Sequence, residues 1–291
     1  MGASMDMDGA KIPAEQTLRI TTLVDNQSVR PELATEHGLA FWIEWRKRRL
    51  LFDTGQGKTL LTNAKILGVP LAAVDAVVLS HGHWDHTGGL LGLLSAGARP
   101  AIFLHPDALR QRYSKWHKPP DEPIGLPSGL AEALHFHCRQ AVWTGARTPI
   151  ADGAWVTGCI PRRTSFEDVG GPFYLDRAFT RPDPIADDQA MWFETPKGTV
   201  VLLGCAHAGV VNTLDYVSEL TGKTAIHAVL GGMHLLRAKA PRLEATLEAF
   251  RRHEVRLVAP AHCTGKRAAA FLAQRLPGCF APCAAGSQFA F

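Results

Sequence analysis

A short segment at residues 80–89, Ser-His-Gly-His-Trp-Asp-His-Thr-Gly-Gly, carries the side chains with the clearest chemistry. Within six residues it places three histidines and one aspartate: His81, His83, Asp85 and His86. Neutral imidazole nitrogens and carboxylate oxygens are the donors that zinc and similar divalent ions take, at about 2.0–2.2 Å. The i, i+2 spacing of His81 and His83 lets both rings converge on one ion. Asp85 and His86 are displaced along the turn, where they are placed to hold a second ion.

The alternative for this segment is a polar loop whose histidines only form hydrogen bonds. Gly82, Gly88 and Gly89 favour a metal site, because glycine permits the tight backbone that brings four donors together. A lone histidine would not support this interpretation, but the cluster does. The segment therefore predicts a metal centre.

Four further segments hold isolated side chains of the same kinds. Asp53 closes a strand-like run and is suited to orient a ligating histidine or the loop, with a simple strand-end turn as the alternative. In the segment Gly-Cys-Ala-His-Ala-Gly, His207 is a candidate ligand and Cys205 a second, softer one. His234 and His262 follow two later strand-like runs. Because ligands in α/β sheets lie at the C-terminal ends of strands, these segments support one another.

Hydrophobic patterning predicts the elements that position these residues. We expect strands at residues 18–25, 39–44, 49–53, 74–80, 100–105, 190–195, 199–204, 225–230 and 256–260, and helices at 58–67, 88–96, 210–221, 241–252 and 265–276. Residues 106–188, rich in proline, aromatic residues and histidine, are expected to form two or three strands with long excursions that wall a pocket. The pattern predicts one mixed α/β domain over residues 1–291.

Composition excludes several classes of protein. A chain of 291 residues with 46% hydrophobic and 20% charged residues is globular rather than disordered. The net charge is 31 − 27 = +4, and the basic run at 46–49 is interpreted as a hairpin turn rather than a nucleic-acid patch. Residues 1–11 lack the pattern of a signal peptide, and no apolar run approaches the roughly 18–20 residues that span a bilayer.

The six cysteines are irregularly spaced and do not indicate a disulfide framework. Cys279 and Cys283 are interpreted as ordinary thiols, with a disulfide or a separate metal contact as the alternatives. A reduced, cytoplasmic protein is therefore expected.

The segments together resemble the metallo-β-lactamase-fold superfamily. The His-x-His-x-Asp-His cluster, preceded by a strand-end aspartate and followed by isolated histidines, is typical of that superfamily. Gly-Cys-x-His-x-Gly, Gly-Gly-x-His-Leu and His-Cys-Thr-Gly resemble one branch of it, the ribofuranosylaminobenzene 5′-phosphate synthase-like, or dihydropteroate-synthase-like, hydrolases. The stretches 158–162 and 187–190 are similar to that branch too, so the resemblance covers residues 18 to 265.

The resemblance implies a four-layer αβ/βα sandwich, with two packed sheets, helices outside and a dinuclear metal site at one sheet edge. By position, the first metal would be bound by His81, His83 and His207, and the second by Asp85, His86 and His262. The superfamily usually also has an aspartate that bridges both metals, whereas Gly-Cys stands here where Gly-Asp is expected. Cys205 or Asp188 is the candidate replacement. The implied cofactors are two divalent ions, with zinc favoured over manganese or iron.

This chemistry predicts a metal-dependent hydrolase. A divalent ion lowers the pKa of bound water from about 15.7 to about 7, which makes a metal-bound hydroxide available for attack on an ester, amide, lactone or phosphoester. Asp85 is expected to orient the nucleophile or take its proton. His234 is expected to bind substrate, and to stabilise the developing oxyanion or protonate the leaving group, with a structural hydrogen bond as the alternative.

The substrate prediction is a small molecule with an aromatic or pterin-like ring and an anionic group. Arg162 is placed to meet the anion, with Trp116 and Trp192 as aromatic walls. For each of these three residues the alternative is a core aromatic side chain or a solvated charge. We expect no nucleic-acid or membrane partner, and a monomer or a homodimer.

Other functions are open at this stage. An iron-dependent oxidoreductase on the same fold would use similar donors, and a synthase acting on a phosphoribosyl or pterin-like substrate would fit the branch. A nuclease is disfavoured because neither a clamp domain nor a strongly basic surface is evident. A non-catalytic metal module is disfavoured because a structural zinc needs only four ligands and no spare histidines.

Overall fold

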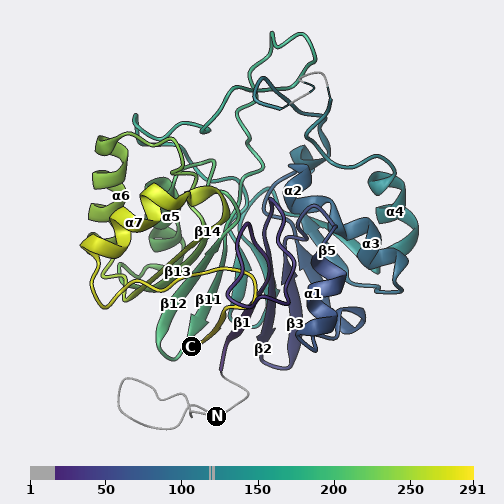
Figure 1. Cartoon of the computed structure of the whole chain (residues 1–291), viewed down its shortest axis with the longest axis horizontal. Coiled ribbons are helices and arrows are strands. Elements are labelled where there is room, and N and C mark those ends of the chain that lie inside the picture. Colours follow the sequence, from purple (N-terminus) through teal and green to yellow (C-terminus); the bar gives the residue numbers. More distant parts are fainter. Residues whose placement is uncertain (1–16, 118, 120–121) are drawn as a thin grey trace.

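The computed structural model describes residues 17–117, 119 and 122–291, and Figure 1 shows the whole chain. The expectation about a signal peptide rests on residues outside this part of the chain. No helix in the described part is both long enough and apolar enough to cross a membrane.

Two β-sheets form the centre of the molecule. The first has seven strands in the order β15-β1-β2-β3-β4-β5-β7 and the second has six in the order β14-β13-β12-β11-β9-β8. The first sheet consists of β1 (Arg19–Val24), β2 (Ala40–Trp45), β3 (Arg48–Phe52), β4 (Ala76–Val78), β5 (Ala101–Leu104), β7 (Gln140–Trp143) and β15 (Gln288–Ala290). The second consists of β8 (Thr148–Ala151), β9 (Ala154–Val156), β11 (Met191–Thr195), β12 (Gly198–Leu203), β13 (Ile226–Gly232) and β14 (Leu257–Ala261).

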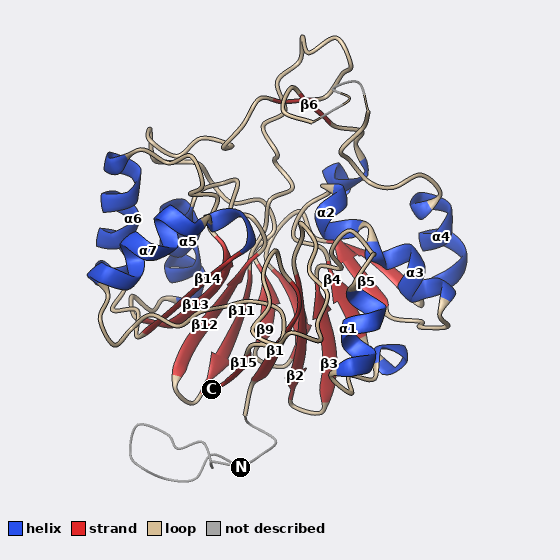
Figure 2. Ribbon diagram, viewed as in Figure 1, coloured by secondary structure: helices blue, strands red, loops and turns tan. Residues whose placement is uncertain are grey.

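Helices cover the outer face of each sheet (Figure 2). The first sheet is covered by α1 (Leu60–Ile66), α3 (Gly89–Ser95) and α4 (Leu130–His137), and the second by α5 (Val210–Thr221), α6 (Ala240–Arg252) and α7 (Lys266–Arg275). The shorter elements are α2 (Trp84–Thr87), the 3₁₀ turns Leu71–Ala73, Pro106–Leu109 and His262–Thr264, and a two-stranded sheet of β6 (Tyr113–Ser114) and β10 (Phe173–Tyr174).

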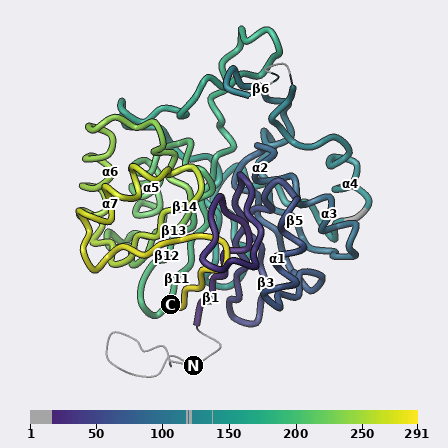
Figure 3. The backbone as a smooth tube through the Cα atoms, in the orientation of Figure 1, coloured from purple at the N-terminus to yellow at the C-terminus, as the bar shows by residue number. Residues whose placement is uncertain are grey.

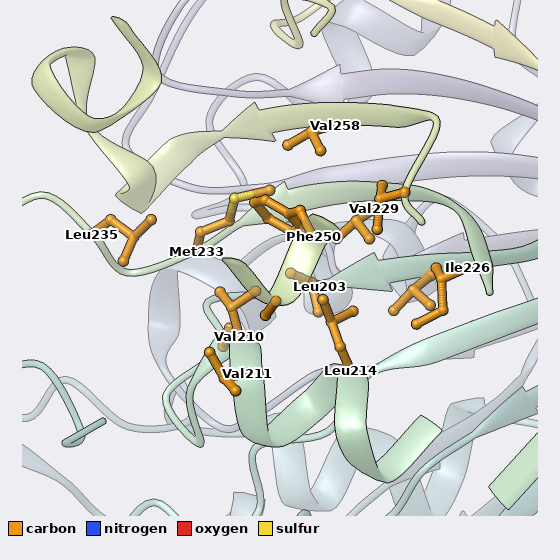
Figure 4. Packing of buried hydrophobic residues seen from close by; sticks show 14 of the residues in the cluster. Leu203, Val210, Val211, Leu214, Ile226, Val229, Met233, Leu235, Phe250 and Val258 are labelled. Atoms are coloured by element: carbon orange, nitrogen blue, oxygen red, sulfur yellow. The ribbon is translucent and has the colours of Figure 1, made fainter. Parts of the chain in front are cut away.

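Three separate hydrophobic clusters show that these elements form four layers. In β12, Val200 and Leu202 face the cluster between the two sheets, whereas Val201 and Leu203 face the cluster beneath α5, α6 and α7. This alternation is the period of two expected of a strand buried on both faces. Figure 4 shows part of the helix-side cluster, where Phe250 of α6 lies among side chains of the second sheet. A third cluster fills the space between the first sheet and its helices. The four-layer sandwich is confirmed.

The expected strands and helices outside residues 106–188 are present to within a few residues, including the hairpin at 46–49 between β2 and β3. The middle region differs, because it contains α4 and five short strands rather than two or three. The chain end differs as well, since β15 pairs with β1 rather than ending as a tail (Figure 3). These strands have two to four residues each, too few for a hydrophobic period to be recognised.

Candidate metal centre

The five motif segments converge at the C-terminal ends of β3, β4, β12, β13 and β14, where the two sheets meet. Asp53 follows β3 and Ser80 lies two residues after β4; a Cβ atom on Gly204, the residue after β12, would lie only 2.0 Å from Ser80 Oγ. The two sheets therefore approach each other here so closely that only glycine fits at position 204. Four non-glycine residues of these segments have left-handed backbone conformations: Asp53, Ala206, His234 and His262, with φ of 60°, 55°, 47° and 49°. Such strain persists where the surrounding structure holds a functional geometry.

His81, His83 and His207 form the first group of converging donors. Their ligand atoms all lie within 4.8 Å of one another, and His81 Nε2 is 3.0 Å from His83 Nδ1. His207 Nδ1 donates to the carbonyl of Val169 at 2.8 Å, which leaves Nε2 with a free lone pair. Nε2 of His83 and Nε2 of His207 are both buried without a hydrogen-bond partner. Buried nitrogens of this kind are rare unless a ligand satisfies them, so the group fits a divalent ion.

Asp53 organises the second group, in which His86 and Cys205 join His81. Its Oδ2 atom lies 2.7 Å from both Ser80 Oγ and His86 Nδ1. The contact with Nδ1 directs Nε2 of His86 towards Cys205 Sγ, at 3.1 Å. Burial lowers the pKa of His86, but the carboxylates of Asp53 and Asp85 outweigh it and raise the pKa to about 9. A metal ion at Nε2 would displace that proton.

Asp85 lies in a third group with His37 and His262. Asp85 Oδ2 is 3.1 Å from His37 Nε2, 3.4 Å from His262 Nε2 and 3.7 Å from His86 Nε2. His262 is held by Asn26, whose Oδ1 accepts from Nδ1 at 2.8 Å, so Nε2 faces the carboxylate. The expected partners of Asp85 are thus brought together, but His37, which the sequence analysis missed, lies nearest to it.

Cys205, Cys263 and His234 form a fourth group. Burial raises the pKa of Cys205 well above its ordinary value. Burial opposes ionisation of Cys263 as well, but hydrogen bonding with Cys205 and the nearby rings of His262 and His234 hold the pKa of Cys263 well below its ordinary value. Of the two thiols, that of Cys263 therefore loses its proton more readily.

The two candidates for the missing bridging aspartate are placed differently. Cys205 belongs to two of the four donor groups, whereas Asp188 belongs to none among the described residues. One oxygen of Asp188 accepts from the backbone N–H of Ala208 at 2.6 Å, and the other is buried without a partner. Burial raises the pKa of Asp188 to about 7. Cys205 is the better placed of the two.

The residues expected to contact substrate are scattered. Trp192 is 1% exposed and stacks on Trp155 within the helix-side core, so the expectation that it forms a pocket wall is wrong. Arg162 borders a cavity of about 310 Å³, and its guanidinium donates to the carbonyls of His207 and Pro184. Trp116 is 45% exposed, with the guanidinium of Arg237 over its ring at 3.9 Å.

Phe173 is an aromatic neighbour of the centre that the sequence analysis missed. Its ring centroid lies 5.0 Å from that of His83, 5.4 Å from that of His207 and 6.3 Å from that of Trp116. It belongs to the two-residue strand β10, which no periodicity could identify. His37 lies directly before Gly38, where a Cβ atom would lie 2.6 Å from the carbonyl oxygen of Asp85; this close approach is a tertiary contact and leaves no signal in the sequence.

Comparison with known sequences extends these observations. The sequence profile of the metallo-beta-lactamase superfamily matches residues 35–216. The chain is 30% identical over 252 residues to 7,8-dihydropterin-6-methyl-4-(beta-D-ribofuranosyl)-aminobenzene-5'-phosphate synthase of Methanocaldococcus jannaschii, which covers 80% of this chain and 83% of that protein. An uncharacterized protein of the same archaeon is 30% identical over 258 residues, covering 88% of this chain and 94% of that protein.

Solved structures share the fold. The crystal structure of Tm1679, a metal-dependent hydrolase of the β-lactamase superfamily, has a TM-score of 0.81 and 31% identity, covering 94% of this chain and 98% of that one. The metallo-β-lactamase fold protein YhfI from Bacillus subtilis has a TM-score of 0.60 at 13% identity, covering 94% and 100% of the two chains. The second likeness is one of fold alone.

Proposed function

Because the chain belongs to the metallo-β-lactamase superfamily, we propose that it is a metal-dependent hydrolase of small-molecule esters, amides, lactones or phosphoesters. One observation carries the proposal: His83 and His207 belong to one group of donors, and the Nε2 atom of each is buried without a hydrogen-bond partner. A cation satisfies such nitrogens, whereas a purely structural loop would pair them with hydrogen-bond donors.

The chain's own residues divide into two sets of ligands. We propose that His81, His83 and His207 hold one divalent ion and that Asp85, His86 and His262 hold the other. Cys205 lies beside the second set through its contact with His86. Zinc fits imidazole, carboxylate and thiolate donors together, and manganese or iron would fit the nitrogen and oxygen donors.

When bound, the ions supply an activated water and polarise the bond under attack. Burial raises the pKa of Asp85, but His86 and the neighbouring imidazoles of His262 and His37 outweigh it and hold the pKa well below its ordinary value. Asp85 is therefore ionised at neutral pH and suited to orient the water, whereas so low a pKa makes it a weak acceptor of the water's proton.

His234 is the proposed group for contact with the substrate or for transfer of a proton to the leaving group. Its Nε2 atom lies 3.3 Å from the carbonyl of Gly170, so Nδ1 is the ring nitrogen available for either role. The flanking side chains of Met233 and Leu235 are fully buried in the helix-side core, which fixes the position of His234 (Figure 4).

The substrate proposal is a small molecule with an aromatic or pterin-like ring and an anionic group. The ring of Phe173 lies beside His83, the ring of Trp116 lies beside Phe173, and the guanidinium of Arg237 lies over the Trp116 ring. An anionic group near that guanidinium would gain a charge-assisted hydrogen bond. We further propose that the protein acts in the cytoplasm as a monomer or homodimer, without nucleic acid or membrane as a partner.

A second candidate is a synthase that acts on a phosphoribosyl or pterin-like substrate. The 30% identity to the archaeal synthase over 80% of this chain favours it. The same donor groups would serve either reaction, because both require an electrophilic centre to be polarised.

The test combines elemental analysis with turnover. Protein purified without added metal should carry at least two zinc or manganese ions per chain by ICP-MS, and should hydrolyse members of a panel of lactones, esters and phosphoesters. His83→Ala should lower turnover by at least about 100-fold, because loss of a group that merely orients a ligand already costs about 10–100-fold. His135→Ala, at an exposed helical position, is the matched control.

Four outcomes would count against the hydrolase. Protein that takes up no metal, or a His83→Ala variant with full activity, would refute it outright. Iron with oxygen-dependent turnover would replace it with an oxidoreductase, and condensation of a pterin with an aminobenzene ribofuranosyl phosphate in place of hydrolysis would support the synthase.

A further inference from the structure

Three neighbouring parallel strands bring two thiols and an imidazole together beside the histidine centre. Leu203 of β12 pairs with Gly231 of β13, and Gly231 pairs with Pro260 of β14. Cys205, His234 and Cys263 each follow these paired residues by two or three positions, so they emerge side by side at the C-terminal edge. Since the register of the sheet sets this arrangement, the cluster is part of the fold.

The three donor atoms are close and enclosed. They lie within 4.8 Å of one another, and the two cysteines are 3% and 8% exposed. Gly232 is required for this approach, because a Cβ atom there would lie 2.8 Å from Cys263 Sγ. A larger residue at that position would push the sulfur away from its neighbours.

His234 contributes a free nitrogen to this cluster. Its Nε2 atom faces the carbonyl of Gly170 at 3.3 Å, which favours the tautomer with the proton on Nε2. Nδ1 is then an acceptor, and it is buried with no hydrogen-bond partner. A carbonyl that fixes one ring nitrogen while the other points at sulfur is the arrangement found for metal-bound histidine.

The sulfur atoms are not fully used by hydrogen bonds. Cys263 Sγ accepts the backbone N–H of His234 at 3.3 Å and lies 3.6 Å from the carbonyl of Cys205. Cys205 Sγ also lies 3.1 Å from His86 Nε2, so it is shared between this cluster and the histidine centre.

We propose that Cys205, Cys263 and His234 form a third, sulfur-rich metal position for a thiophilic divalent ion such as zinc, with Cys205 shared with the histidine centre. Two thiolates and one imidazole are zinc donors, and a set of three protein ligands leaves a fourth position open. Binding would convert each thiol to a thiolate and release its proton to solvent. In this proposal, Nδ1 of His234 binds a metal ion and does not transfer a proton. The proposal does not depend on which reaction the histidine centre performs.

The experiment uses cadmium alone as the probe, because cadmium–thiolate bonds absorb in the near ultraviolet. Metal-free full-length protein is titrated with Cd²⁺, and the thiolate band and the bound cadmium per chain are measured. Wild-type protein should show a band of two-thiolate intensity. Cys263→Ser should roughly halve it and lower the cadmium content by about one ion per chain. The matched control is Cys283→Ser, which removes a buried thiol that contacts Thr22 and belongs to none of the donor groups among the described residues.

His234→Gln separates the two roles proposed for that residue. If His234 is a metal ligand, the variant should bind cadmium at least about 10-fold more weakly, as followed by the thiolate band. If His234 only donates a proton, the cadmium titration should be unchanged, and this result would refute His234 as the third ligand. A Cys263→Ser variant that keeps the full band and cadmium content would overturn the whole proposal.

A measurement on the wild-type protein tests the proposed site without any substitution. X-ray absorption of the zinc-loaded wild type should show sulfur together with nitrogen and oxygen among the atoms bonded to zinc. Zinc bonded only to nitrogen and oxygen would refute the site, even if every cysteine variant failed to fold.

Discussion

At the scale of single residues, Asp53 determines how the metal-binding segment is arranged. Its two carboxylate oxygens accept from the backbone N–H and the hydroxyl of Ser80 and contact His86 Nδ1, all at 2.7 Å. Ser80 Oγ in turn lies 2.9 Å from His81 Nδ1. One fully buried carboxylate therefore orients two of the proposed ligands, and fixes which nitrogen of His86 faces Cys205.

Asp53→Asn should lower zinc affinity by about 10–100-fold, because the amide nitrogen replaces an acceptor that His86 or Ser80 needs. Asparagine tolerates the left-handed backbone at this position, so the fold should be retained. Zinc affinity is measured by competition with a chromophoric chelator. Asp152→Asn, at a side chain that is 83% exposed, should bind zinc as the wild type does. Equal affinity in the two variants would remove the positioning role of Asp53.

At the scale of elements, a cluster of polar side chains, here called the clamp, connects α5 to the end of α6. Asp215 of α5 accepts from Arg252, at the end of α6, at 2.6 Å and lies 2.8 Å from His253 Nε2. Burial raises the pKa of Asp215, but the hydrogen bonds from Arg252 and His253 outweigh it and hold the pKa below its ordinary value of 3.8. The clamp helps to keep α5 in place directly after the segment that carries His207.

Asp215→Asn should lower the free energy of unfolding by about 0.5–1 kcal/mol at pH 7, since the pair is partly exposed and screened by solvent. A carboxyl whose pKa is lowered by folding contributes stability above its unfolded pKa and loses it as the pH falls through the folded pKa. The difference between variant and wild type should therefore shrink towards zero below about pH 3.

Urea denaturation at a series of pH values measures this difference. Glu248→Gln, which alters a 3.8 Å exposed contact with Arg251 in the same helix, is the control and should change stability little at any pH. A stability difference for Asp215→Asn that stays constant with pH would show that packing, rather than charge, is responsible.

At the scale of the whole molecule, a buried ion-pair network connects the long middle segment to the metal centre. Arg112 is 1% exposed, and its guanidinium bonds to the carboxylates of Asp183 and Asp187. Asp187 in turn accepts the backbone N–H of Gly82 at 2.7 Å, between His81 and His83. The segment that rises above the sheets in Figure 1 is thus joined to the loop carrying the first two ligands.

Arg112→Met should lower the free energy of unfolding by about 3–5 kcal/mol, because it leaves two carboxylates buried without their cation. Arg110→Met removes an exposed partner of Asp107 and should cost no more than about 1 kcal/mol. Both values are obtained from urea denaturation of the metal-free protein. Zinc affinity, measured in parallel, should fall in Arg112→Met alone. If the two variants have similar stability and similar zinc affinity, the network does not position the loop.

Much of this architecture was predictable from local patterns. Apart from β15, the strands of both sheets outside the middle region were found where apolar runs placed them, because burial on both faces imposes a continuous apolar sequence. The histidines and Asp85 were identified for a similar reason, since the spacing of donors within one loop is itself local. The superfamily followed from the same residues and was confirmed by the sequence profile.

The chain's sequence by itself therefore determined the candidate metal donors and the elements that present them. Only the tertiary structure decided their partners: His37 beside Asp85, Cys263 beside Cys205, and Trp192 in the core instead of a pocket wall. These contacts depend on the register between strands and on the approach of two sheets whose residues are far apart in the chain. A local pattern carries no information about such pairings, because they are set by how separate elements pack together.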